Sequence, residues 1–376
     1  MTRVSLFVAA AVWAGAMSFQ SVPVAESNDP KVVAALETIR AKHGLPALGA
    51  AVVTSHGVTS VGVTGVRKIG TTVAATPADL WHLGSDTKAM TAVVIGSLVE
   101  QHKLTWETTI DEVLSAHVGS APEAFRKITV LQLLSHRAGL VSNIDWRRAS
   151  RAPGGPRAQR IAALATIATT PLSSAPGTTY EYSNLGYVVA GVMAEQTANR
   201  AWEDLLRDIV FSRLGMTSCG FGGLGTPGQV DQPWPHDAAG KPMPANGPDV
   251  DNPEVLGPAG TAHCSLGDWG KFVADQLAGL NGKAGVLQAA TYVQMHAPAF
   301  GGNYAAGWLV TSRPWGGGTV YTHNGSNTMN FATVWMAPAR DFAVLVVTNR
   351  GGAVAQQATD DAAAALILMR AGGGLP

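Results

Sequence analysis

Charged side chains are scarce in this sequence, and neither sign predominates. Lys, Arg, Asp and Glu make up 14% of the 376 residues, and the 26 basic side chains balance the 26 acidic ones. A chain with zero formal net charge gives no electrostatic reason to expect binding to nucleic acid or to an anionic membrane surface. With 46% hydrophobic residues, the composition favours a globular protein with a large core, as one domain or two closely packed ones.

Cysteine and metal-binding patterns are also scarce. Only Cys219 and Cys264 are present, without CxxC spacing, and the scattered histidines contain no H-E-x-x-H pattern. These absences argue against a structural zinc site, and we expect no metal or other cofactor. In an exported protein the two cysteines could form a disulfide. They could equally be two buried free thiols, and the sequence does not decide between these alternatives.

The first residues have the pattern of an export signal. Arg3 precedes a short apolar run, 4–13, and small-residue cleavage sites follow at 14–16 and at Ala25. The run is too short for a membrane span. We therefore predict a signal peptide over residues 1–25, a periplasmic or secreted mature protein, and no stable membrane anchor after cleavage. The alternative is a buried N-terminal helix.

Strand-like segments lie near both ends of the chain, while helical patterns and long loops fill the middle. The expected strands cover 48–54, 58–65, 304–311, 319–323, 331–336 and 343–348. Helices are expected at 30–43, 87–100, 185–198, 201–214 and 354–369, with another beginning near 128.

This distribution predicts an α/β (α+β) fold. The strands from the two ends can join in one antiparallel sheet flanked by helices, interrupted by an inserted all-α domain, with a cleft between the two parts. We assign residues 26–103 and 299–376 to the α/β domain and 104–298 to the helical domain. Within the latter, 220–258 is rich in Gly, Pro and Asp, and such long loops often border a site.

The most informative motif is Ser85-Asp86-Thr87-Lys88, where a helical pattern begins. Residues three apart share a helix face, so the Lys88 amine can lie beside the Ser85 hydroxyl. A desolvated lysine can lose its charge and act as a base, and a serine needs such a base to become a nucleophile. The pair therefore indicates acyl-enzyme chemistry. Taken alone, Ser85 could be only a helix N-cap and Lys88 a solvated surface lysine.

Two further motifs follow in the chain, Tyr182-Ser183-Asn184 and His323-Asn324-Gly325-Ser326. With Ser85 and Lys88, they closely resemble the serine β-lactamase and penicillin-binding-protein superfamily over nearly all of the mature chain. The nearest pattern is that of class C β-lactamases and their esterase, D-aminopeptidase and DD-peptidase relatives. This resemblance implies a β-lactamase/transpeptidase-like fold.

The resemblance also implies a role for each matching residue. Ser85 would be the nucleophile, Lys88 its general base, and Tyr182 a proton relay to the leaving group. Asn184 would hydrogen-bond an acyl amide of the substrate. The backbone N–H groups of Ser85 and Ser326 would form the oxyanion hole, where the loss of one donor typically costs about 10²–10³ in rate.

The third motif departs from the family pattern, which is usually Lys-Thr-Gly. Here His323 replaces the lysine that provides a fixed positive charge, and we expect it to be only partly charged near neutrality because unperturbed histidine has a pKa of about 6.5. Asn324 keeps hydrogen-bonding capacity, and Gly325 leaves room for substrate. We expect these three residues to contact substrate. The change argues against efficient β-lactam hydrolysis and leaves acyl-enzyme chemistry intact.

We therefore predict an exported serine hydrolase whose partner is a small-molecule ester, amide or peptide. An esterase-like enzyme fits best, followed by a D-Ala-D-Ala carboxypeptidase or D-aminopeptidase and then a true class C-type β-lactamase. A non-catalytic binder of a cell-wall fragment is the alternative from another class. We interpret His82 and His136 as structural, and Ser265 as the N-cap of a following helix.

Overall fold

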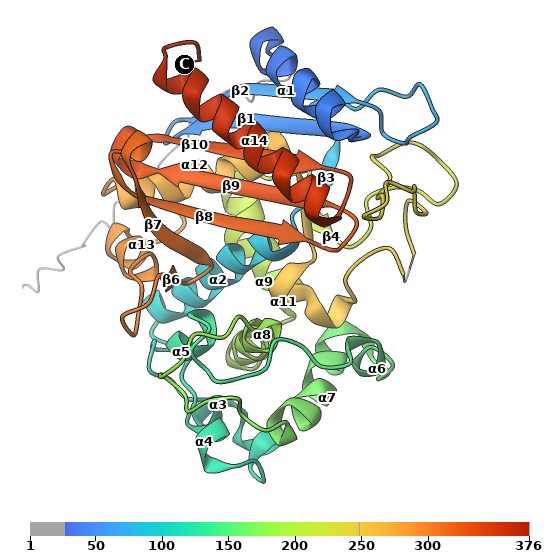
Figure 1. Cartoon of the computed structure of the whole chain (residues 1–376). Coiled ribbons are helices and arrows are strands. Elements are labelled where there is room, and N and C mark those ends of the chain that lie inside the picture. The colour runs from blue at the N-terminus through green and yellow to red at the C-terminus, as the bar shows by residue number, and fades with distance from the viewer. Residues whose placement is uncertain (1–26, 248, 376) are drawn as a thin grey trace, which may run out of the picture.

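Apolar segments from the two ends of the chain pair in a single seven-stranded sheet. The computed structural model describes residues 27–247 and 249–375, so the predicted signal peptide lies outside the described residues. The sheet is antiparallel throughout, in the order β2-β1-β10-β9-β8-β7-β6 (Figure 1). Its strands are β1 (Ala47–Thr54), β2 (Gly57–Gly65), β6 (Tyr304–Ala305), β7 (Trp308–Arg313), β8 (Gly318–Ser326), β9 (Phe331–Ala337) and β10 (Phe342–Thr348). The predicted joining of N- and C-terminal strands is confirmed.

Both faces of the central strands are buried. Along β1, Ala50 and Val52 belong to one hydrophobic cluster, while Ala51 and Val53 belong to a second cluster on the opposite face. Successive side chains of a strand point to opposite faces. A strand buried on both faces must therefore be apolar at nearly every position, as this one is.

Helices α1 (Pro30–His43) and α14 (Gly352–Ala371) cover one face of the sheet (Figure 1). Asp29 caps the start of α1 by accepting a hydrogen bond from the Lys31 N–H. Gly44, in the left-handed conformation with φ of 60°, ends the helix.

The opposite side of the sheet faces the helical layer. Helix α2 (Thr87–Glu100) matches its predicted bounds and packs against α8 (Asn184–Ala198), and α12 (Leu266–Leu280) contributes to the same core. α12 packs directly on β1 and β2, where the absence of a side chain at Gly270 admits the Val58 methyl group. The range 104–298, assigned to the helical domain, therefore includes one helix that covers the sheet.

The remaining helices are short, apart from α7. They are α3 (Ile110–Val118), α4 (Glu123–Arg126), α5 (Val130–Leu134), α6 (Trp146–Ala149), α7 (Gly155–Thr169), α9 (Trp202–Leu206), α10 (Ser212–Leu214), α11 (Gly257–Gly260) and α13 (Ala289–Met295). The predicted helix over 201–214 is divided, because a π-helical turn at Arg207–Phe211 separates α9 from α10.

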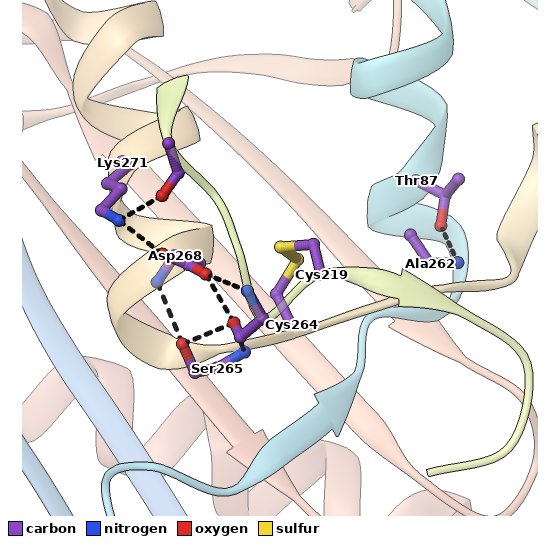
Figure 2. The surroundings of a disulfide bond; sticks show 9 residues. Thr87, Cys219, Ala262, Cys264, Ser265, Asp268 and Lys271 are labelled. Carbon is purple, nitrogen blue, oxygen red and sulfur yellow. Dashed lines mark hydrogen bonds and ion pairs between the residues drawn. A yellow bond between two sulfur atoms is a disulfide. The ribbon is translucent and has the colours of Figure 1, made fainter. Parts of the chain in front are cut away.

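A small second sheet was not predicted. It contains β3 (Leu80–His82), β4 (Gly220–Phe221) and β5 (Ala262–Ser265), in the order β3-β5-β4. Cys219 and Cys264 form a disulfide beside it (Figure 2), which decides between the two alternatives that the sequence left open. The ends of the long loop 220–258 are thereby fastened together. Ser265 caps α12, as predicted.

Among residues 27–247 and 249–375, no helix is both long and apolar enough to span a bilayer. In that part of the chain, no three His, Cys, Asp or Glu side chains gather in an arrangement suited to a metal ion.

Candidate active site

Ser85 lies in a tight 3₁₀ turn, Gly84–Asp86, that leads directly into α2. The turn requires a left-handed residue at Gly84, with φ of 49°. The Ser85 side chain makes no capping hydrogen bond, because the cap position of α2 belongs to Asp86. Lys88 is fully buried. The two alternative interpretations, a capping serine and a solvated lysine, are therefore both wrong.

The Lys88 amine has three oxygen neighbours. Its Nζ lies 2.9 Å from Ser85 Oγ, 2.8 Å from Asn184 Oδ1 and 2.7 Å from the carbonyl oxygen of Ala259. The amide and carbonyl oxygens can only accept hydrogen bonds. A neutral amine that donates its two protons to them has its lone pair left for the Ser85 hydroxyl proton. The contacts therefore suit a lysine that acts as a base.

Burial favours this neutral form. Desolvation lowers the pKa of Lys88 well below that of an ordinary lysine, and the nearby Asp86 carboxyl opposes the shift. Asp86 is itself buried, and desolvation raises the pKa of its carboxyl well above the usual range. A neutral Asp86 opposes the deprotonation of Lys88 less than a charged carboxylate would.

Tyr182 approaches Ser85 from the helical layer. Its phenolic OH donates a hydrogen bond to Ser85 Oγ at 2.7 Å. The ring of His136 packs against the Tyr182 ring with centroids 4.4 Å apart, and His136 Nδ1 accepts a hydrogen bond from the Ser183 N–H. Burial raises the pKa of Tyr182 above that of free tyrosine. The phenol is therefore protonated at neutral pH and acts first as a hydrogen-bond donor.

Asn184 is the first residue of α8, directly after the capping residue Ser183. Its Oδ1 accepts from Lys88, and its Nδ2 donates to Asn143 Oδ1 at 2.9 Å. Asn184 thus joins the base to the loop before α6.

The end of β8 lies directly against the nucleophile turn. A Cβ at Gly325 would overlap the carbonyl oxygen of Leu83, and one at Gly84 would overlap the backbone nitrogen of Ser326. Only glycine permits this approach of the two backbones. The structure thereby brings the backbone of Ser326 next to Ser85, where the family resemblance places an oxyanion hole.

His323 differs from the expectation of partial charge. Burial and the nearby Lys88 lower its pKa to about 3, so the ring is neutral near pH 7. Its Nε2 lies 2.8 Å from the Tyr304 hydroxyl, and its Nδ1 lies 3.4 Å from Asp86 Oδ1. The next residue, Asn324, is exposed at the surface of the strand. Of this pair, Asn324 is the one accessible to a substrate.

Three residues near the centre had no predicted role in the site, namely Asp86, His136 and Tyr304. His136 was interpreted as structural, and the structure places it behind Tyr182. Tyr304, in β6, reaches His323 only because the sheet brings β6 and β8 together. Sequence spacing carries no signal for that contact.

A family model described as Beta-lactamase matches residues 32–369. Penicillin-binding protein 4 of Amycolatopsis lactamdurans is 28% identical over 182 residues, which cover 48% of this chain and 46% of that protein. The unguisins hydrolase ungD' of Aspergillus campestris is 27% identical over 292 residues, with 73% and 53% covered. The chain thus spans about half the length of these curated relatives.

A solved structure has the same fold over most of the chain. The octameric penicillin-binding protein homologue from Pyrococcus abyssi superposes with a TM-score of 0.73 and 20% identity. The match covers 92% of this chain and 79% of the other.

Proposed function

The chain belongs to the β-lactamase family, and from this premise we propose that it is a serine hydrolase that cleaves an ester or amide through a Ser85 acyl-enzyme. The observation that carries the proposal is the pair of hydrogen-bonding contacts on the Ser85 hydroxyl. Lys88 Nζ lies 2.9 Å away and the Tyr182 hydroxyl 2.7 Å away. The Lys88 amine can accept the serine proton, and the Tyr182 hydroxyl can supply a proton to the leaving group.

In the proposed acylation, Ser85 Oγ attacks the carbonyl carbon and its proton passes to Lys88 Nζ. The charge on the carbonyl oxygen is stabilised by the backbone N–H groups of Ser85 and Ser326. As the bond to the leaving group breaks, Tyr182 gives its proton to that group. The Lys88 ammonium returns a proton to Tyr182, whose ring centroid lies 4.8 Å from Nζ. Water then releases the acyl group and regenerates Ser85.

For the substrate, we propose an ester-like or peptide-like carbonyl compound rather than a β-lactam. Efficient recognition of the β-lactam carboxylate favours a cation at the third motif, and His323 is neutral there. Two relatives carry the names of a penicillin-binding protein and of a hydrolase, which supports hydrolytic chemistry, and an amide or peptide is the second choice. A non-catalytic binder is disfavoured because Ser85, Lys88 and Tyr182 are all present.

We also propose that the protein is exported. The apolar run after Arg3 supports this, and so does the Cys219–Cys264 disulfide, since such bonds persist in oxidising compartments. N-terminal sequencing of the protein recovered from the periplasm or medium should give a start near residue 17 or 26. Recovery of an intact N-terminus in the cytosol alone would contradict export.

The central test is covalent labelling of Ser85. Intact-mass spectrometry after incubation with a fluorophosphonate should show one adduct per chain, and peptide mapping should place it on Ser85. Ser85→Ala should abolish both the adduct and turnover. Ser120→Ala is the matched control, because Ser120 is exposed. Labelling elsewhere, or turnover that survives in Ser85→Ala, would refute the proposal.

A substrate panel then orders the alternatives. A short p-nitrophenyl ester, a D-Ala-D-Ala peptide and nitrocefin should be compared by kcat/KM. We expect the ester to be turned over best, and a clear preference for nitrocefin would overturn this order.

A further inference from the structure

We propose that His82, Asp251 and Asn327 form a polar clasp that fixes the two backbone N–H donors of the oxyanion hole relative to each other. The three side chains would be positioning residues for acylation, so this inference rests on the proposed function. None of them contacts Ser85 Oγ. The clasp connects the turn that carries Ser85 with the turn that follows Ser326.

The first half of the clasp holds the nucleophile turn. His82 is buried at the end of β3, and its Nδ1 accepts a hydrogen bond from the Gly84 N–H at 3.0 Å. Because Nδ1 accepts, Nε2 is the ring nitrogen that carries a proton. Nε2 lies 2.7 Å from Asp251 Oδ1. The residue directly before Ser85 is thereby connected through one imidazole ring to a carboxylate.

The second half holds the turn after β8. Asn327, also buried, donates from Nδ2 to the same Asp251 Oδ1 at 3.1 Å. Its own Oδ1 accepts the backbone N–H groups of Met329 and Asn330, at 3.2 and 2.9 Å. Asn327 therefore fixes the conformation of its turn and connects that turn to Asp251. The residue before it, Ser326, would supply the second oxyanion donor.

Asp251 is suited to join the two halves. Burial works to raise the pKa of its carboxyl, but the contacts with His82 and Asn327 outweigh that effect and the pKa is lowered. An ionised carboxylate forms stronger hydrogen bonds than a neutral acceptor. Asp251 comes from the long loop 220–258, whose ends are fastened by the Cys219–Cys264 disulfide. Three segments distant in sequence therefore meet at one oxygen atom.

The proposed oxyanion hole is sensitive to small displacements of its two backbone donors. An oxyanion hole acts only when its donors lie about 2.7–3.1 Å from the developing negative charge. Ser85 and Ser326 belong to different elements, and their backbones touch without side chains between them, at Gly84 and Gly325. Glycine contacts permit the approach, but they do not fix its distance. The hydrogen bond from Asn327 to Asp251 and the 2.7 Å approach of His82 Nε2 to the same oxygen can do so.

The test is a pair of single variants and their combination. Asp251→Asn keeps the size of the side chain and removes its charge. Asn327→Asp keeps the oxygen that accepts from the turn, but it places a second carboxylate against Asp251. Each single variant should lower kcat for a p-nitrophenyl ester by about 10–100-fold, approaching the loss of one oxyanion donor, with KM changed less than about threefold. Affinity for an arylboronic acid, which forms a charged tetrahedral adduct on serine, should fall by a similar factor.

The double variant Asp251→Asn/Asn327→Asp restores a donor–acceptor pair between residues 251 and 327, while the contact of His82 Nε2 with residue 251 stays altered. It should therefore recover part of the kcat that Asn327→Asp loses. Asp249→Asn is the matched control. It lies two residues away on the same loop, pairs with Arg147 at the surface, and should leave kcat unchanged.

The outcomes separate the two proposals. If wild-type Ser85 is not phosphonylated by the fluorophosphonate, the proposed function fails and the clasp fails with it. If the wild type is active and both single variants keep its kcat, only the clasp is refuted. The fluorophosphonate also counts the active sites in each variant. If kcat falls only in proportion to that count, the remaining sites work normally and the clasp is refuted. Failure of both single variants to fold, with no recovery in the double variant, would indicate a purely structural contact and would likewise overturn it.

Discussion

The protonation of Lys88 is the residue property on which the proposed chemistry depends most. Its pKa is lowered by burial, and only the neutral amine can accept the Ser85 proton. The rate of acylation should therefore rise with pH through the lowered pKa of Lys88 and reach a plateau below the ordinary lysine range near 10.5. A pH profile of kcat/KM for a p-nitrophenyl ester measures this directly.

The controls for Lys88 are simple. Lys88→Ala should remove the rising limb and lower kcat/KM by about 10²–10⁴-fold, the usual contribution of a general base. Lys103→Ala, at an exposed site just beyond α2, should leave the profile unchanged. Suppose that kcat/KM of the wild type does not change between pH 5 and 9, while Lys88→Ala abolishes turnover. That combination would count against Lys88 as the base.

His323 should contribute to stability more than to charge recognition. His323→Ala removes a buried ring and leaves the Tyr304 hydroxyl without its partner, so we expect a loss of about 2–4 kcal/mol in the free energy of unfolding. Urea denaturation at pH 7 measures it. His56→Ala, at an exposed turn, should change stability by less than about 0.5 kcal/mol. Equal stability of the two variants would show that the Tyr304–His323 contact is not important.

At the scale of residues, the sequence predicts a contact where the chemistry requires a fixed spacing along one helix. Ser85 and Lys88 share one helical turn, so their proximity follows from local geometry, and the structure has their side chains 2.9 Å apart. The charge of His323 could not be predicted in this way. It depends on burial and on Lys88, and both come from tertiary packing.

At the scale of elements, the approach of β8 to the nucleophile turn depends on a single missing side chain. A methyl group at Gly325 would overlap the Leu83 carbonyl oxygen, so Gly325→Ala must displace β8 from Ser85. A displacement of 1 Å at a reacting centre can cost about 10²-fold in rate, and we expect a loss of that size in kcat/KM for the ester. Steady-state kinetics on folded protein, verified by circular dichroism, measures it.

Gly372→Ala is the matched control for this prediction. Gly372 ends α14 with φ of −81°, and a Cβ there would make only an ordinary contact. Its activity should equal that of the wild type. Wild-type kinetics in Gly325→Ala would mean that β8 can move without consequence for acylation.

Long elements were predictable, while short ones were not. The helix at 87–100 has its predicted bounds, and its long apolar sequence is buried on all sides from Thr87 to Leu98. The strands β3, β4 and β5 have two to four residues each, too few for a periodic pattern. Yet β3 carries His82, and β5 is bonded to α2 through the Ala262 N–H and Thr87 Oγ (Figure 2). The sequence therefore predicted the reacting groups but not the small sheet that supports them.

At the scale of the whole molecule, the fold depends on contacts between segments far apart in the chain. Such contacts are costly in chain entropy, because each closes a long loop. The first strand pairs with the last, from Leu48 with Thr348 to Val53 with Ala343. The long loop 220–258 has little regular structure of its own, and its position depends on its fastened ends and on contacts such as those of the largely buried Asp251 side chain.

The Cys219–Cys264 disulfide should therefore contribute strongly to global stability. It joins residues separated by 45 positions, and the chain-entropy estimate for a closed loop of that size is about 4 kcal/mol. Cys219→Ala/Cys264→Ala should lower the free energy of unfolding in guanidinium by about that amount, and reductant should have no further effect on this variant. The wild type, unfolded and refolded in reductant, should approach the stability of the variant. Since Cys264 pairs with Trp81 across β3 and β5, a variant as stable as the wild type would mean that strand pairing alone holds the loop ends beside the nucleophile turn.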